Sequence, residues 1–280
     1  MELINKTVRH KILGEGTITG IQDRVVFVEF SGELKKFAFP DAFSEHLCLV
    51  DKKCKAYVDR LLDKYNREIE LLREAEQQEL EKRRLHAKLP ISDNSQAAFS
   101  FIHNDRQKVL RDWAVTTGTY LSGSNYGKPR IASEIYPNTA CILTYLDKNN
   151  PEEKRYIWGL FMVSDDFVGA ECTDGIIPAH PEYRLELPAE TKGRFLFWQH
   201  FEPTPLGKRP HWGSREFRYV SNWKTANLLL DIYCTLHGPK KQLCREFFEY
   251  FCRLNKFSSE AMLSHLDNKR KISGGHRFSP

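Results

Sequence analysis

The stretch from Asp51 to Leu89 holds neither glycine nor proline and is filled with strong helix formers. It predicts a single helix of about forty residues, which at about 1.5 Å per residue would be on the order of 60 Å long. A helix of that length is either a spacer between two domains or part of a coiled coil through which two copies of the chain pair.

The apolar side chains of this predicted helix form one stripe, which stops before the helix does. They recur at steps of three and four residues, at Val58, Leu61, Leu62, Tyr65, Ile69, Leu72 and Ala75. The run EQQELEKRR that follows is polar all round. A sustained coiled coil needs apolar heptads throughout, so we expect the helix to pack through its first half only, with a homodimer through residues 51–90 as the alternative. Pro90 and the polar residues after it predict a hinge.

Residues 1–50 contain short β-branched runs separated by turn-forming residues. The runs are GTITGI at 16–21, RVVFVEF at 24–30 and LKKFAF at 34–39. Strands this short can hide their apolar sides only by curling into a small barrel. Gly14 and Gly16 are expected at a bend or bulge where a Cβ atom would clash.

This N-terminal pattern resembles the Tudor/SH3-like module at the C-terminus of UvrD/PcrA-type helicases and, more loosely, CarD-type domains. The matching positions are Val8, His10, Gly14, Gly16, Ile18, Val28, Phe30, Lys36 and Phe37. The resemblance implies docking on nucleic acid or on a protein, such as RNA polymerase or a subunit of a defence complex. This chain departs from those helicases because the module is N-terminal and no helicase motor is attached.

Residues 97–257 are expected to form a second, mixed domain, so that the chain as a whole is α+β. The run at 97–115 predicts a helix or helix pair, and the runs at 140–146, 155–163, 183–187 and 194–201 predict strands. Two helices are predicted at 222–238 and 240–255. Residues 258–280 are expected to be a flexible basic tail.

The predicted strand at 155–163 resembles one in the PUA-like superfamily of small barrels, which includes EVE, ASCH and YTH domains. Gly159, Leu160, Phe161 and Val163 match its motif. The resemblance implies recognition of DNA or RNA, often of one modified or flipped base held between aromatic rings.

A pocket for such a base needs rings to stack on it, polar groups for its edge and cations for the flanking phosphates. Residues 201–280 carry fourteen basic and seven acidic residues, which gives this segment a net charge of +7. The net charge of the whole chain is +5, so positive charge is concentrated in this segment. The candidate nucleic-acid-binding residues are Trp158, Lys208, Arg209, Trp212, Arg215, Arg218, Tyr219, Asn222 and Trp223. Trp158 and Phe161 would face opposite sides of a regular strand, so at most one of them could point into a given pocket.

Two other functions remain open from the residues. Asp165, Asp166 and Glu171 could hold a divalent metal in a nuclease of a restriction or phage-defence system, although no E-x-K strand follows them. The run GTYLSGSNYGKPR at 118–130 lacks the end of a phosphate-binding P-loop and is either a pocket wall or a plain loop. The whole chain could also be a protein-interaction adaptor.

Cofactors, metals and membranes are not expected partners. Seven cysteines include no pair at CxxC spacing, which favours buried thiols over a metal site. No run approaches about eighteen apolar residues, and the N-terminus lacks the apolar stretch of a secretory signal. We therefore expect a cytoplasmic protein, and most simply a non-enzymatic one that binds nucleic acid.

Overall fold

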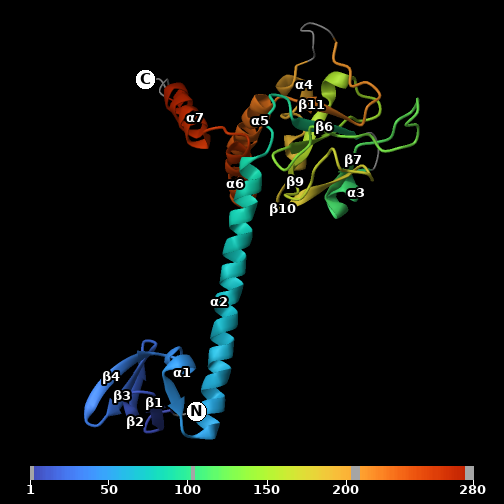
Figure 1. The fold of residues 1–280 in the computed structure, drawn as a ribbon. Helices are drawn as coiled ribbons and strands as arrows, with labels where there is room; N and C mark the ends of the chain where they lie inside the picture. Colours follow the sequence, from blue (N-terminus) through green and yellow to red (C-terminus); the bar gives the residue numbers. More distant parts are fainter. Residues whose placement is uncertain (1–2, 102–104, 203–208, 275–280) are drawn as a thin grey trace, which may run out of the picture. The chain divides into compact units, whose positions relative to one another are not determined.

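The structure is a computed structural model that describes residues 3–101, 105–202 and 209–274. The fold is α+β, as predicted, and the chain divides into two compact units, residues 1–81 and 82–280 (Figure 1). The boundary falls near the end of helix α2 (Lys52–Ala87), which lies within three residues of the predicted helix at each end. The two units are described separately below.

The N-terminal unit is built on five antiparallel strands in the order β4-β3-β2-β1-β5. They are β1 (Thr7–His10), β2 (Gly14–Gln22), β3 (Val25–Phe30), β4 (Glu33–Ala38) and β5 (Leu47–Leu49), with the short helix α1 (Ala42–Glu45) before β5. A Cβ atom on Gly16 would lie 2.7 Å from the carbonyl oxygen of Glu29, and Gly14 has a φ of +77°. Both positions therefore require glycine. At Gly16 the backbone of β3 approaches too closely for a side chain, and at Gly14 the backbone adopts a left-handed conformation.

Helix α2 joins the core of the N-terminal unit through its first turns only. Asp51 Oδ1 accepts hydrogen bonds from the backbone N–H groups of Lys53 and Cys54 and so caps the helix start. Val58 and Leu62 are buried against the sheet, whereas Leu71 is 66% exposed. Within this unit only the first turns of the helix pack, but His86 near the helix end is buried in the C-terminal unit, so the expectation that only the first half packs was wrong at that end.

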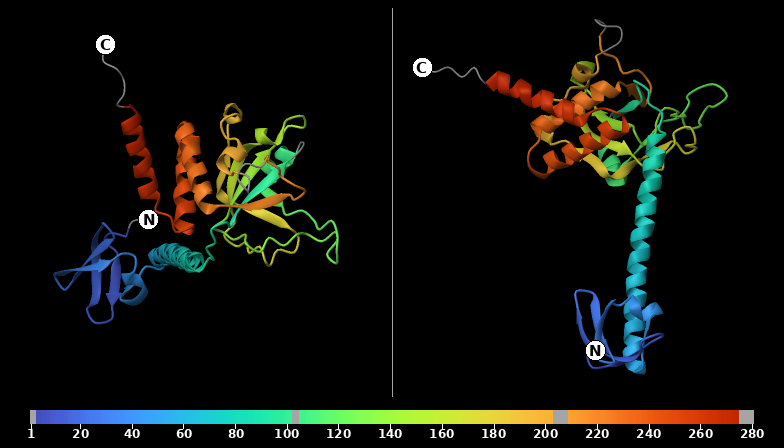
Figure 2. Two further views of the ribbon diagram at one scale, coloured as in Figure 1. Left: turned by 90° about the horizontal axis from the view of Figure 1, so that it is seen from above. Right: turned by 60° about the vertical axis from the view of Figure 1, so that its left-hand side comes forward.

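The C-terminal unit contains a curled sheet of six strands in the order β11-β6-β8-β9-β10-β7, in which only the β6–β8 pair is parallel. The strands are β6 (Gln96–Phe101), β7 (Ala114–Thr116), β8 (Ala140–Tyr145), β9 (Tyr156–Val163), β10 (Ile176–Glu186) and β11 (Phe217–Val220). The helices are α3 (Asp105–Asp112), α4 (Phe197–His200), α5 (Asn222–Thr235), α6 (Gly238–Leu254) and α7 (Ser259–Gly274), with 3₁₀ turns at Glu152–Lys154 and Ala189–Thr191. Helices α5 and α6 lie side by side and cover one face of the sheet (Figure 2).

A β-bulge in β9 changes which side chains share a face. Leu143 pairs with Gly159 and Thr144 pairs with Ile157, so that Trp158 is an extra residue between the two pairs. Trp158 and Phe161 therefore lie on the same face, in the cluster that includes Phe99. The expectation that they face opposite sides was wrong, because it assumed a regular strand.

Three predicted elements differ from the structure. Residues 97–101 belong to strand β6 instead of a helix, since this strand is covered on both faces and its run of apolar residues has no period of two. The run at 194–201 contains the short helix α4 instead of a strand. The expected flexible tail is helical over Ser259–Gly274, and residues 275–280 lie outside the described part of the chain.

Three buried amide side chains tie the sheet to the helices. Asn222 Oδ1 accepts a hydrogen bond from the backbone N–H of Ser95 at 3.0 Å, and Asn222 Nδ2 donates to Asn255 Oδ1 at 3.1 Å. Gln96 Nε2 also donates to Asn255, while Gln96 Oε1 accepts from the backbone N–H of Ala140. Asn222 is 3% exposed. Its predicted role at the edge of a bound base is therefore wrong; it holds the start of α5 in place.

The variant Asn222→Ala is expected to lose about 3 kcal/mol of stability, because it leaves the buried backbone N–H of Ser95 without its acceptor and removes one of the two donors to Asn255 Oδ1. Chemical denaturation followed by circular dichroism measures the loss. Asn227→Ala, on the same helix but bonded only to the backbone of Trp223, is the matched control and should change stability by less than about 0.5 kcal/mol. Equal effects of the two substitutions would contradict the network.

Candidate nucleic-acid interface

Strand β11 is an edge strand, and two adjacent hollows border it. The first hollow, of about 260 Å³, is lined by Asn94, Trp198, Glu202, Arg218, Tyr219 and Lys224 among others. The second hollow, of about 290 Å³, is lined by Tyr120, Arg130, Arg215, Phe217, Arg218 and Tyr219. Arg218 and Tyr219 are common to both, so β11 forms the wall that the two hollows share.

Arg218 is held in this wall by aromatic rings. Its guanidinium carbon lies 5.1 Å from the ring centroid of Trp198 and 5.4 Å from that of Trp212. Arg155, which is 1% exposed, lies 4.5 Å from the ring of Trp212. A guanidinium group over an indole is attracted by the negative face of the ring. Together these side chains form a layer of alternating cations and indoles.

The ring nitrogens of Trp198 and Trp212 each donate a hydrogen bond. Trp212 Nε1 donates to the carbonyl oxygen of Arg215 at 2.8 Å, and Trp198 Nε1 donates to Glu152 Oε1 at 3.2 Å. Glu152 also accepts from Arg155. The indoles are therefore fixed in orientation, and the planar group of Arg218 is fixed with them.

Arg218 is a half-buried cation without a close carboxylate partner. Burial lowers the pKa of its guanidinium, which nevertheless stays charged because arginine titrates far above neutral pH. Within the described residues, no carboxylate oxygen lies within 4.0 Å of its nitrogens. A pre-oriented positive charge at the junction of two hollows is suited to bind an anion such as a phosphate group.

Further cations surround Arg218. Arg215 is exposed, and Lys224 Nζ lies 3.6 Å from the carboxylate of Glu202. Arg130 Nε lies 3.3 Å from Glu216 Oε2, and this carboxylate fills the space that the missing side chain of Gly118 leaves. The interface is thus predominantly positive.

The run at 118–130 is a loop whose base lines a hollow, so it combines both of the alternatives that the sequence left open. It leaves the sheet as an extended loop, drawn in green (Figures 1 and 2), and is held by hydrogen bonds between its own two arms, from Tyr120 N to Lys128 O and from Arg130 N to Gly118 O. Tyr120 and Arg130 at its base line the second hollow, and Arg130 lies 5.4 Å from the ring of Tyr120. Tyr126, farther along the loop, is 73% exposed.

The structure places the predicted binding residues in different environments. Arg215, Arg218 and Tyr219 lie together at the hollows, Arg209 is exposed, and Trp223 is 55% exposed on α5. The rings of Trp158 and Trp212 are buried at 2% and 8% exposure, so neither can stack on a base in this conformation, and the prediction for them was wrong. Lys208 lies outside the described residues.

Sequence reasoning missed the residues that the fold brings to β11 from elsewhere. Asn94, Tyr120, Arg130 and Glu202 come from three separate segments of the chain. The only signal for any of them was the glycine-rich composition of the run that contains Tyr120 and Arg130.

The acidic residues proposed for a nuclease do not form a metal site. Asp165 accepts hydrogen bonds from His86 Nε2 at 3.0 Å and from the hydroxyl of Tyr250 at 2.7 Å, and it pairs with Lys82 and His180. Asp166 and Glu171 are exposed. Within the ranges that the structure describes, no group of three or more metal-ligating side chains could hold an ion.

Asp165 instead fastens the last turns of α2 to the C-terminal unit. Burial alone would raise the pKa of Asp165, but hydrogen bonds from His180, Lys82 and Tyr250 outweigh it and hold the pKa well below its usual range. Burial lowers the pKa of His86, although Asp165 opposes the shift. His180 Nδ1 accepts from two backbone N–H groups, so its proton is on Nε2, which faces Asp165.

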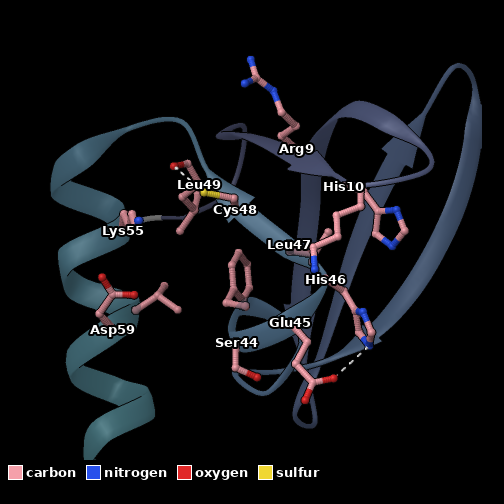
Figure 3. Close-up of a pocket in the computed structure, with 13 residues that line it drawn as sticks. Arg9, His10, Ser44, Glu45, His46, Leu47, Cys48, Leu49, Lys55 and Asp59 are labelled. Carbon is pink, nitrogen blue, oxygen red and sulfur yellow. Dashed lines mark hydrogen bonds and ion pairs between the residues drawn. The ribbon is translucent and has the colours of Figure 1, made fainter.

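The N-terminal unit has a hollow of its own, of about 440 Å³, between β1, α1, β5 and α2. Lys55 and Asp59 project from α2 toward β5 and α1 (Figure 3). The ring of His10 is fixed because its Nδ1 accepts from the backbone N–H groups of Ile12 and Leu13, both at 3.1 Å. Ile12 itself is 88% exposed beside this site.

Comparison with known proteins finds no matching family model, no matching curated protein and no matching solved structure. Within the described ranges, none of the helices carries an apolar stretch long enough to cross a bilayer. Any function of the chain therefore has to be inferred from the chemistry of its sites.

The variant Asp165→Asn is expected to lower stability by about 2 to 4 kcal/mol, because it removes the charge that four donors surround.

Wild-type stability should fall as the pH drops below about 6.5, since unfolded His86 binds a proton more readily than folded His86. It should fall again near the ordinary aspartate pKa of about 3.9, because folded Asp165 resists protonation.

Thermal melts from pH 8 to pH 3 measure both effects. The exposed neighbour Asp166→Asn is the matched control and should follow the wild-type curve. If Asp165→Asn kept wild-type stability and the same acidic loss, Asp165 would not be the fastening group.

Proposed function

We propose that the C-terminal unit binds single-stranded nucleic acid, DNA or RNA, along strand β11, and that the protein acts by binding and not by cleavage. The observation that carries this proposal is the guanidinium of Arg218, half-buried between Trp198 and Trp212 and free of an ion pair within the described residues. Phosphate is the ligand that such a fixed, planar cation suits best.

Single-strand recognition is favoured over duplex recognition by the shape and content of the site. Nucleic-acid single strands are bound in positively charged grooves that also offer aromatic side chains. Tyr219 and Tyr120 border the hollows, and Arg130 and Arg215 add positive charge on the same side. The hollows are concave and of nucleotide size, whereas a protruding helix or ribbon would be needed to enter a major groove.

The second part of the proposal concerns the N-terminal unit, which we propose contacts a protein partner. The support is the hollow of about 440 Å³, together with the exposed side chain of Ile12 next to it. A role in a defence or transcription-associated complex would follow from a partner of that kind.

The alternative is that two chains pair through α2, which would cover the exposed leucines of that helix. Gel filtration with light scattering distinguishes a dimer from a monomer.

The first prediction is salt-dependent binding of a labelled single-stranded oligonucleotide, measured by fluorescence anisotropy. The logarithm of affinity should fall linearly with that of salt concentration, by about 0.7 for each phosphate contact. Arg215→Ala and Lys224→Ala should each weaken binding and reduce this slope by about one contact. Arg218→Lys keeps the charge but loses the planar stack, so we expect a loss of about tenfold.

Arg245→Ala is the matched control for these variants, because Arg245 lies on α6, which lines neither hollow. It changes net charge by the same amount as Arg215→Ala and should leave affinity and slope unchanged. No measurable binding by the wild type, or equal losses in Arg215→Ala and Arg245→Ala, would overturn the proposed interface.

The second prediction concerns the N-terminal unit. A protein partner captured by the full chain should remain bound after nuclease treatment and should be lost with Ile12→Asp, which places a charge beside the hollow. Leu71→Asp, which also places a charge on an exposed apolar position, is the control. Partners that disappear with nuclease, or that tolerate Ile12→Asp, would refute this part of the proposal.

A further inference from the structure

The two hollows beside β11 differ in chemistry. The second hollow offers three guanidinium groups and three aromatic rings and, within the described residues, no carboxylate in its lining. The first hollow adds the amide of Asn94 and the hydroxyl of Ser221, which can donate and accept hydrogen bonds, and the carboxylate of Glu202, which can only accept them. A hollow of cations and rings suits phosphate and sugar, whereas one with mixed donors and acceptors suits the edge of a base.

Glu202 is the residue that needs an explanation. Among the described residues it is the only carboxylate lining either hollow. A negative charge at a phosphate-binding surface weakens binding through like-charge repulsion. Its presence is therefore accounted for most directly if it makes a favourable contact that only some ligands can offer.

The pairing of Glu202 with Lys224 does not account for it. Their charged atoms are 3.6 Å apart, and the side chains are 60% and 42% exposed. An ion pair this exposed contributes little to stability, so either side chain can turn to a ligand at small cost. Lys224 is placed by its backbone, since its N–H donates to the cap residue Ser221 at the start of α5.

A carboxylate accepts hydrogen bonds and cannot donate them. Amino groups on the pairing edge of a base are the donors that it fits, and guanine presents a ring N–H and an amino group side by side, so that both oxygens can be used. Thymine and uracil place carbonyl oxygens on both sides of their single N–H, and these repel a carboxylate.

We infer that Glu202 makes the first hollow selective for a base with an amino group on its pairing edge, guanine foremost, while Arg218 and the second hollow hold the adjoining phosphate. This inference rests on the proposed function, because it assigns specificity to the same single-strand site. Glu202 is thus a specificity-determining residue, and Asn94, which also lines this hollow, can accept or donate a further bond to the same edge.

The test uses five-nucleotide single strands of thymidine in which the central base is guanine, inosine, adenine, cytosine or thymine. Hypoxanthine, the base of inosine, is guanine without its amino group and keeps the ring N–H, so the two bases differ in the one hydrogen bond that the amino group donates to Glu202. We expect the full-length protein to bind the guanine strand on the order of tenfold more tightly than the inosine and thymine strands. Competition against a labelled strand, read by anisotropy, gives the ratios.

Glu202→Ala should reduce both ratios to within about twofold and should strengthen binding of the thymine strand, because the repulsion of phosphate is removed as well. Glu202 is exposed, so the substitution is not expected to affect folding. Glu171→Ala, an exposed carboxylate outside both hollows, is the control for the charge change and should keep the tenfold ratios.

The outcomes separate the inference from the proposed function. Equal binding of all five strands by the wild type, or a guanine preference that persists in Glu202→Ala, overturns the inference and leaves single-strand binding intact. Binding of none of the strands, nor of longer ones, overturns both.

Discussion

The stacking of guanidinium groups on indole rings is the contact on which the β11 surface depends. Arg155 lies over one side of Trp212, and Arg218 contacts both Trp212 and Trp198. Because the indole nitrogens are also hydrogen-bonded, the rings cannot turn to release the arginine. A long, flexible side chain is thereby held at one place with its charge intact. Preorganisation of this kind increases affinity by removing part of the entropy that binding would otherwise cost.

The position of this stack is set by the buried polar groups of the C-terminal unit. Asn222 fixes the start of α5 against the segment that leads into β6, and β11 pairs with β6 from Phe217 to Val220. Arg155 is fixed at the opposite end of β6 by Ser100 and Glu152. The β11 surface thus lies at an edge of the sheet, while the loop at 118–130 adds residues from a separate segment.

Local sequence patterns predicted the elements that carry a clear period or cap. The helix from Asp51 followed from its composition, and the N-terminal strands followed from β-branched runs between glycines. Strand β6 was missed because both of its faces are buried, which removes the alternation that marks a strand. The face of Trp158 was missed because a bulge depends on the partner strand and leaves no local signal.

The candidate site was predictable only where its residues are neighbours in sequence. Arg215, Arg218 and Tyr219 stand close together in a run of cations and rings, and this composition pointed to them. The sequence did not reveal which of the rings are exposed. Trp212 and Trp223 have similar sequence surroundings, yet Trp212 is buried and Trp223 is exposed. Asn94, Arg130 and Glu202 reach the hollows through the tertiary fold, which a single sequence does not reveal.

Photo-crosslinking tests most directly whether β11 is the contact surface for nucleic acid. Single strands carrying 4-thiothymidine would be irradiated with the full-length protein, and the modified residues would be located by mass spectrometry. Crosslinks are expected to concentrate in the segments that supply the lining of the two hollows, within residues 120–131, 197–202 and 215–224. Crosslinks confined to residues 3–81 or to α7 would show that the strand binds elsewhere and would contradict binding along β11.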